Sequence, residues 1–143
     1  MAKPTGYSGT PLARKLGITD STVVMPIGAP DDYRAWLMPL PDNVTFATRL
    51  GARVDVVHLF ATERELLAST LTRLRHRIRE DSAVWVSWPK RSAKVPTDIT
   101  EDVIRAVALP MGFVDIKVCA VTEVWSGLKL VIRKELRRAL SRP

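Results

Sequence analysis

Cysteine is almost absent from this chain of 143 residues, and Cys119 is the one example. A single cysteine excludes an internal disulfide and a metal site built from several thiolates, and it fits a reducing compartment. Long apolar runs are also missing, because none approaches the ~20 residues that a membrane-spanning helix needs. Residues 1–17 contain no apolar stretch of the kind found in signal peptides, so we expect no secretion signal. These absences indicate a cytoplasmic protein.

Histidine is scarce as well, with His58 and His76 as the two examples. They lie in different predicted elements, with no cysteine or further histidine at ligand spacing, so we expect no metal site. Cys119 lies in an apolar segment, which is typical of an inert core thiol rather than a nucleophile. Neither Ser8 nor Ser126 stands in the strand, Gly-x-Ser-x-Gly, helix context of a hydrolase nucleophile. The sequence therefore identifies no reaction and leaves the catalytic residues, if any, unknown.

Positive charge is in excess, with a net charge of +7 and an isoelectric point near 10.1. Much of the excess lies near the C-terminus, where six Lys or Arg residues accompany the single acid Glu135 between residues 129 and 143. We interpret 1–143 as one domain with an irregular N-terminal arm at 1–9 and a basic C-terminal segment at 134–143. Such a segment favours solvation or weak affinity for polyanions, so nucleic-acid binding stays open but is not favoured.

Apolar segments alternate with amphipathic ones along most of the chain. Strands are predicted at 21–28, 43–50, 54–61, 83–88, 113–121 and 128–133. Helices are predicted at 10–17 behind Thr10, within 29–40, from the capping box Thr62–Glu65 to Ile78, and at 101–109 behind Thr100. In the third helix the predicted buried face consists of Leu66, Leu67, Leu71, Leu74 and Ile78. The last two strands are joined by 122–127, a connection that suits a hairpin and is too short for a crossover helix.

This order predicts an α/β protein with a three-layer, Rossmann-like fold. Helical crossovers make the first strands parallel, and the closing hairpin makes the sixth strand antiparallel. The arrangement resembles the core of the class I S-adenosylmethionine methyltransferases, shortened by one strand–helix unit near the second strand. This resemblance implies the strand order 2-1-3-4-6-5.

The cofactor contacts that this resemblance implies are largely missing from the sequence. The enzymes place an acidic residue and a glycine-rich turn after the first strand, whereas this chain reads MPIGAP with Gly28 alone, which is typical of a simple turn. They place another acidic residue at the end of the second strand, where this chain has Arg49. We therefore expect no S-adenosylmethionine binding in the usual mode, and the sequence indicates no other cofactor.

Four segments carry a second resemblance: 6–18, 54–62, 84–105 and 118–137. They are similar to a family of short bacterial proteins, common in actinobacteria, that is classified as a domain of unknown function. The match runs nearly end to end, and several long motifs agree in order. It implies a methyltransferase-like Rossmann core but no reaction, substrate or catalytic residue.

A candidate ligand site follows from the expected topology. In doubly wound sheets, ligands bind outside the carboxyl ends of the parallel strands. The predicted ligand-binding residues at that edge are Trp88, Lys90, Arg91, Lys94, Thr97, Asp98, Trp125 and Ser126. Cations favour an anion and indole rings favour a flat group, and we expect Trp88, Lys90 and Trp125 to converge on one pocket. The alternative is that Trp88 caps the core and the cations belong to a solvated loop.

Two further features of this edge are left with alternatives. Asp98, near Lys94, is a candidate acid or base, but it is also explained as a residue that favours a helix N-terminus. Residues 7–10 could fold over the edge as a lid or pack against it as a plug.

The function that these patterns favour is a non-catalytic, methyltransferase-like domain. It would bind a small anionic or nucleotide-like ligand, or a protein partner, at the carboxyl edge of the sheet. One alternative is an enzyme that uses the same edge without S-adenosylmethionine, and another is weak nucleic-acid binding through the basic C-terminal segment. The sequence does not indicate an oligomeric state or a role at membranes.

Overall fold

The computed structural model describes residues 10–137, so residues 1–9 and 138–143 lie outside the described part, together with most of the predicted N-terminal arm and the end of the basic segment. The helices are α1 (Leu12–Lys15), α2 (Tyr33–Trp36), α3 (Arg64–Arg77) and α4 (Glu101–Ala108). The strands are β1 (Val23–Ile27), β2 (Thr45–Phe46), β3 (Val56–Phe60), β4 (Ala83–Pro89), β5 (Phe113–Ala120) and β6 (Trp125–Ile132). Short 3₁₀ turns follow β4, α4 and β6 as η1 (Arg91–Ala93), η2 (Leu109–Met111) and η3 (Lys134–Leu136).

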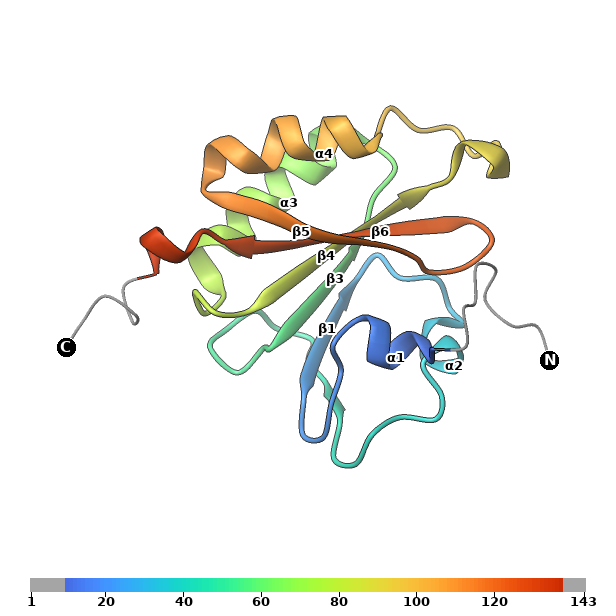
Figure 1. The fold of residues 1–143 in the computed structure, drawn as a ribbon, viewed down its shortest axis with the longest axis vertical. Helices are drawn as coiled ribbons and strands as arrows, with labels where there is room; N and C mark the ends of the chain where they lie inside the picture. The colour runs from blue at the N-terminus through green and yellow to red at the C-terminus, as the bar shows by residue number, and fades with distance from the viewer. Residues whose placement is uncertain (1–9, 138–143) are drawn as a thin grey trace.

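The six strands form one sheet in the order β2-β1-β3-β4-β6-β5. β1 pairs in parallel with β2 and β3, and β3 pairs in parallel with β4. β6 lies between β4 and β5 and is antiparallel to both (Figure 1). The predicted α/β class, strand order and antiparallel sixth strand are confirmed. The short connection between β5 and β6 forces the antiparallel return, because a parallel return needs a crossover.

Helices cover both faces of the sheet, with α3 and α4 on one side and α1 and α2 on the other (Figure 1). Successive strand residues enter different cores: Val57 packs with the residues beneath α3 and α4, whereas Val56 packs with those against α1 and α2. β3 is buried along its whole length, as expected for a central parallel strand covered on both faces. None of the described helices is long and apolar enough to cross a membrane.

Several predicted boundaries are wrong in detail. The second strand covers Thr45–Phe46 rather than 43–50, because it is an edge strand that meets β1 at two positions only. The first helix is preceded by Pro11 as its N-cap, without a side-chain cap. Leu66 is 50% exposed instead of belonging to the buried face of α3. Leu67 and Leu71 are spaced four residues apart on the buried stripe, and Leu66 lies about 100° away from it.

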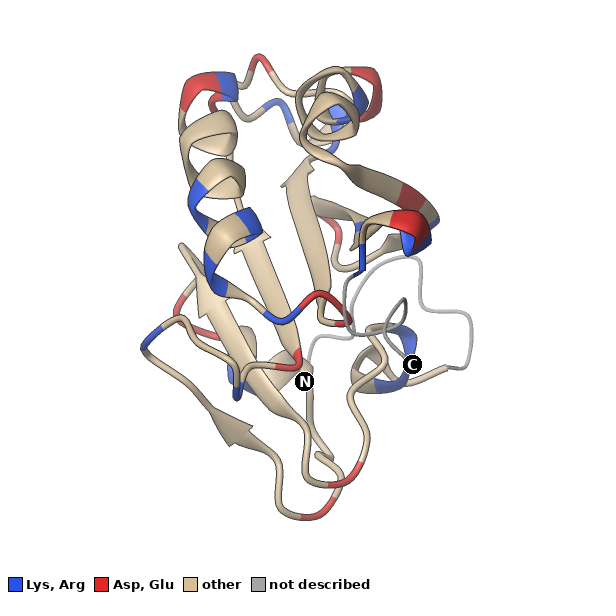
Figure 2. Cartoon of the chain, turned by 90° about the vertical axis from the view of Figure 1, so that its left-hand side faces the viewer, with Lys and Arg blue, Asp and Glu red and all other residues tan. Residues whose placement is uncertain are grey.

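Charged residues are distributed unevenly over the helices. Figure 2 shows basic residues recurring along α3, and α4 carries acidic residues in its first turn. The Arg105 guanidinium pairs with Glu101 within α4 and also donates to Asp115 on β5 (Nε to Oδ2, 2.9 Å). The first turn of α4 is capped as predicted, since Thr100 Oγ1 accepts from the Val103 amide at 3.2 Å. These contacts hold α4 against the edge strand β5.

Candidate functional site

Trp88 lies in the core rather than at the surface, with 8% of its area exposed. It packs beneath α3 and α4, whereas Trp125 packs against the cluster on the opposite face. The register explains the difference, because Trp88 pairs with Ser126 while the neighbouring Pro89 pairs with Trp125. Adjacent residues of a strand point to opposite faces of the sheet. The predicted convergence of Trp88 and Trp125 on one pocket is therefore wrong.

Lys90 does adjoin the β5–β6 turn at the carboxyl edge. Its backbone amide donates to the carbonyl oxygen of Val124 at 2.7 Å, one residue before Trp125. The predicted last strand, 128–133, begins three residues earlier because Trp125 and Ser126 pair with β4. Trp125 and Ser126 are therefore strand residues and not part of a flexible connection. Lys90 and Trp125 share one edge of the sheet.

The predicted cations form a compact segment, residues 90–94, which we call the cationic turn. Arg91 and Lys94 are exposed and Lys90 is half-buried. Lys94 has a left-handed backbone, with φ of 56°, and so reverses the chain after η1. Within residues 10–137 none of the three cations forms an ion pair with a carboxylate. The cationic turn therefore presents three uncompensated charges to solvent.

Thr97 and Asp98 anchor the far side of the cationic turn to the start of α3. Thr97 Oγ1 donates to the Thr62 carbonyl at 2.6 Å, and Asp98 Oδ1 accepts from the Arg64 amide at 2.6 Å. The predicted capping box from Thr62 to Glu65 is wrong, because the N-cap position is Glu63 and its side chain makes no cap bond. The first amide of α3 is instead satisfied by a carboxylate 34 positions away in the sequence. Both Thr97 and Asp98 thus have structural roles.

Replacing Asp98 with Ala is expected to lower the free energy of unfolding by about 1 kcal/mol, the usual cost of a lost helix cap. Asp98→Asn keeps an acceptor oxygen and should cost less, with urea denaturation as the measurement. Asp102→Ala is the matched control, because Asp102 is exposed and lies one position into α4. Equal losses for Asp98→Ala and Asp102→Ala would contradict the capping role.

The crevice where this fold type binds ligands lies between the carboxyl ends of β1 and β3, because the strand order changes direction there. Gly28 follows β1 with φ of 69°, and a Cβ added to it would lie 3.0 Å from the Phe60 carbonyl oxygen. The two strand ends therefore approach each other closely. Gly28 is a turn residue, as predicted, and its positive φ together with this approach requires glycine.

Aromatic side chains fill the space beside this crevice. Tyr33 and Phe60 meet edge to face with ring centroids 5.5 Å apart, and they are 2% and 4% exposed. Trp125 packs edge-on against Phe60 at 5.0 Å, and Trp36 lies 6.2 Å from the same ring. Such pairs contribute dispersion and quadrupole attraction beyond the area that they bury. The sequence analysis did not identify Tyr33 or Phe60, although an aromatic in α2 and one at the end of an apolar strand were visible signals.

A buried hydrogen-bonded chain lies directly beneath the aromatic cluster. His58 is fully buried; its Nδ1 lies 2.8 Å from the Tyr33 hydroxyl and its Nε2 lies 2.7 Å from Ser87 Oγ. Burial lowers the pKa of His58 to about 3, and it raises the pKa of Tyr33 well above its usual value. His58 is therefore neutral at physiological pH and belongs to the core. Among residues 10–137, no group of three His, Cys, Asp or Glu residues is placed to hold a metal ion.

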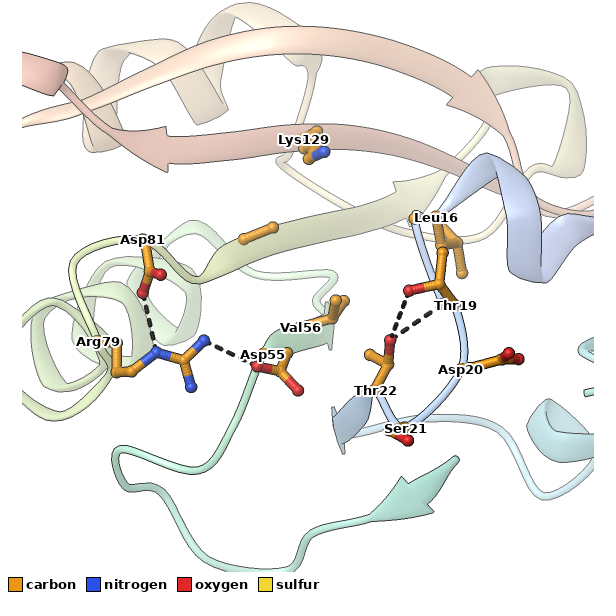
Figure 3. Close-up of a pocket in the computed structure, with 12 residues that line it drawn as sticks. Leu16, Thr19, Asp20, Ser21, Thr22, Asp55, Val56, Arg79, Asp81 and Lys129 are labelled. Atoms are coloured by element: carbon orange, nitrogen blue, oxygen red, sulfur yellow. Dashed lines mark hydrogen bonds and ion pairs between the residues drawn. The ribbon is translucent and has the colours of Figure 1, made fainter. Parts of the chain in front are cut away.

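A polar pocket of about 420 Å³ lies at the opposite, amino edge of the sheet (Figure 3). There Arg79 donates to Asp81 at 2.9 Å and to Asp55 at 2.7 Å, and Asp55 also accepts from the Val23 amide at 2.8 Å. The hydrogen bond from Arg79 holds the pKa of Asp81 below its usual value. This network joins the end of α3 to the starts of β1 and β3. Lys129 of β6 also lines the pocket (Figure 3).

No protein-family model matches the chain, and no curated protein matches it. Solved structures do resemble it. A putative type 11 methyltransferase from Sulfolobus solfataricus has a TM-score of 0.61 at 12% identity, covering 86% of this chain and 90% of that one. An S-adenosylmethionine-dependent methyltransferase from Aquifex aeolicus has a TM-score of 0.60 at 14% identity, covering 85% and 88%. Aeropyrum pernix fibrillarin, solved with natively bound S-adenosylmethionine, has a TM-score of 0.51 at 15% identity, covering 84% and 73%. These likenesses show a class I methyltransferase-like fold.

The residues at the carboxyl edge do not fit the cofactor of that fold in the usual crevice. A Cβ at position 28 would lie 3.0 Å from the Phe60 carbonyl oxygen, so the backbone after β1 runs close to the end of β3. Buried Tyr33 and Phe60 fill the adjoining space. After β2 the chain presents the exposed cation Arg49 where the fold's enzymes hold the cofactor ribose with an acid.

Proposed function

We propose that this chain is a non-catalytic, methyltransferase-like binding domain that holds a small anionic or nucleotide-like ligand at the carboxyl edge of its sheet. The cationic turn would supply the charge that binds the ligand. The observation that carries the proposal is the firm attachment of that turn at both ends. Lys90 is bonded to the β5–β6 turn on one side, and Thr97 and Asp98 are bonded to the start of α3 on the other.

This attachment matters because ligand binding orders the residues that contact the ligand. A turn whose backbone is already held in place loses less conformational entropy on binding than a flexible loop does. The backbone of the cationic turn is already positioned by sheet and helix contacts. Three charges within five residues raise the local potential, and no described carboxylate neutralises them. A phosphate or carboxylate group is the ligand chemistry that suits such a turn.

The acid or base candidate that the sequence predicts beside the cationic turn is already engaged in the fold, which supports a non-catalytic role. Asp98 is the nearest carboxylate in the sequence, and its Oδ1 is engaged with the Arg64 amide. His58 is closed off from solvent and is neutral. Neither residue is placed to exchange a proton with a ligand at the cationic turn.

Isothermal titration calorimetry with pyrophosphate, ADP and S-adenosylmethionine tests this proposal. We expect binding heat with pyrophosphate or ADP and none with S-adenosylmethionine. The triple variant Lys90→Gln, Arg91→Gln, Lys94→Asn should weaken binding about ten- to hundredfold, since a charge-assisted contact contributes about 1.5–3 kcal/mol. Asparagine is chosen at position 94 because it tolerates the left-handed backbone there.

The matched control removes three exposed arginines, Arg53, Arg73 and Arg77, each replaced by Gln. It lowers the net charge by the same amount, but its positions lie toward the amino edge of the sheet. We expect it to bind within about twofold of the wild type, because exposed charges more than a Debye length from the ligand are screened. The proposal fails if neither pyrophosphate nor ADP binds, if the cationic-turn variant binds as tightly as the wild type, or if S-adenosylmethionine binds at low micromolar concentration.

A further inference from the structure

A second group of cations lies between α1 and the β5–β6 hairpin, on the face of the sheet that α1 and α2 cover. Arg14 and Lys15 of α1 and Lys117 of β5 line a groove of about 550 Å³. Lys129 of β6 adjoins them, since its Nζ would lie 4.0 Å from a Cβ added to Gly17, just beyond α1. We call these four cations and the space between them the basic groove. It is distinct from the cationic turn in both sequence and position.

Lys117 and Lys129 stand directly opposite each other in the register of β5 and β6. Opposed residues of an antiparallel pair lie on the same face, with Cβ atoms about 4.5–5.5 Å apart, and like charges there are destabilising. A repulsive pair beside two more cations is a local conflict, and local conflicts of this kind concentrate at functional sites.

Carboxylates do not relieve this repulsion in the described part of the chain. The described lining of the groove contains no acidic residue. Within residues 10–137, Arg14, Lys117 and Lys129 form no ion pair. The amino-edge pocket that Lys129 also lines contains Asp20, Asp55 and Asp81. Arg79 pairs with the last two, and Asp20 accepts from the Asp42 amide.

We propose that the basic groove binds the phosphate backbone of a nucleic acid. The described lining of the groove offers charge from both walls but contains no aromatic ring and no buried polar side chain that would orient a base or a sugar. Such a surface recognises repeated negative charge rather than one small molecule. The proposal goes beyond the anion site at the cationic turn and places nucleic-acid contact on a folded surface, away from the basic C-terminal segment.

The chain's single cysteine supplies a built-in probe. Cys119 lies in the groove lining next to Lys117 and is partly exposed. Burial raises the pKa of its thiol, while the charges of Lys15 and Lys117 act in the opposite direction. A bound phosphate backbone would cover the thiol and neutralise those charges. Coverage slows alkylation by blocking access to the thiol. Neutralising the lysine charges slows it by raising the pKa of the thiol, because the thiolate is the reacting form.

The experiment measures fluorescence anisotropy of a labelled oligothymidylate with the full-length protein across a salt series. Engagement of four cations predicts a slope of log affinity against log salt of about −3. The variant Arg14→Gln, Lys117→Gln, Lys129→Gln should reduce the slope to about −1 and weaken binding about a hundredfold at roughly 0.1 M salt. Without ligand, the same variant should melt about 1–3 °C higher, because it removes the opposed lysine pair.

Three comparisons make the result decisive. The cationic-turn variant and the Arg53, Arg73 and Arg77 variant each remove the same charge as the basic-groove variant. Both should bind oligothymidylate within about threefold of the wild type. Equal weakening in these two variants and in the basic-groove variant would overturn the proposal. Removal of residues 138–143 should leave most binding intact, and its complete loss in that truncation would assign the contact to the C-terminal segment. Bound oligothymidylate should slow the reaction of Cys119 with neutral iodoacetamide. Polyphosphate should compete with oligothymidylate for the basic groove, and ADP should not. An unchanged alkylation rate, or equal competition by ADP, would count against a polyanion in this groove.

Discussion

Replacing Trp88 with Ala is expected to lower the free energy of unfolding by about 3–5 kcal/mol, as for other buried aromatic residues cut back to alanine. Trp88 is almost completely buried among the residues beneath α3 and α4, with Leu128 and Ile99 in the same cluster. Removing the indole would leave a cavity that strands β4 and β6 cannot close, because both are fixed by their backbone pairing. Urea denaturation monitored by far-UV circular dichroism measures the loss.

Two further variants separate packing from ligand contact. Trp88→Phe keeps most of the apolar volume and should cost about 1–2 kcal/mol. Lys90 lies only two positions away, but it is half-exposed and forms no ion pair in the described part of the chain. Lys90→Ala should therefore change the free energy of unfolding by about 0.5 kcal/mol or less. A Trp88→Ala protein of normal stability that had lost binding to an anion would show that the tryptophan reaches the ligand, contrary to its burial.

The second large effect is a loss of folding stability at acidic pH, which we expect His58 to cause. Its pKa is lowered from 6.5 in the unfolded chain to about 3 in the fold, so the unfolded state binds more protons between those values. Stability from this group is therefore complete above about pH 6.5 and falls as pH drops toward 3. The slope is about 1.4 kcal/mol per pH unit, which amounts to about 3 kcal/mol by roughly pH 4.

His58→Gln is the matched variant, because an amide can bond to both Tyr33 and Ser87 but does not titrate. Its free energy of unfolding at neutral pH should be lower than that of the wild type, and its dependence on pH between 6.5 and 4 should be much flatter. Hydrogen bonds from arginines lower the pKa values of Asp81 and Asp115, so the contribution of these two carboxylates to folding stability also falls in acid. That loss is the same in the wild type and in His58→Gln. Identical pH dependence in the wild type and His58→Gln would contradict the neutral, buried histidine.

Local patterns in the sequence were sufficient to predict the main elements. The apolar run at 54–61 contains β3, and Thr100 caps α4 as predicted. The length of the connection before β6 settled the antiparallel return, and the resemblance to the class I methyltransferase core supplied the strand order. These features follow from side-chain periodicity, capping and connection length, which act within a few residues of each other.

The candidate site was predicted less well, because it depends on which face each residue occupies. The register of β4 against β6 directs Trp88 and Trp125 to opposite faces, and a shift of one residue would pair them on the same face. Long-range contacts were equally hidden from the sequence. Asp98 caps a helix that begins 34 positions earlier, in place of the local capping box.

The sequence by itself determined that this protein is a three-layer α/β fold with a reversed last strand, an excess of positive charge and cations after β4. Tertiary structure alone decided how that charge is divided, since it gathers Arg14, Lys117 and Lys129 from three separate elements into one groove. It also decided that aromatic rings fill the crevice where this fold type binds its ligands. The physical reason is that periodicity is a property of neighbouring residues, whereas burial and charge repulsion depend on distances that arise only when the strands pair and the helices pack.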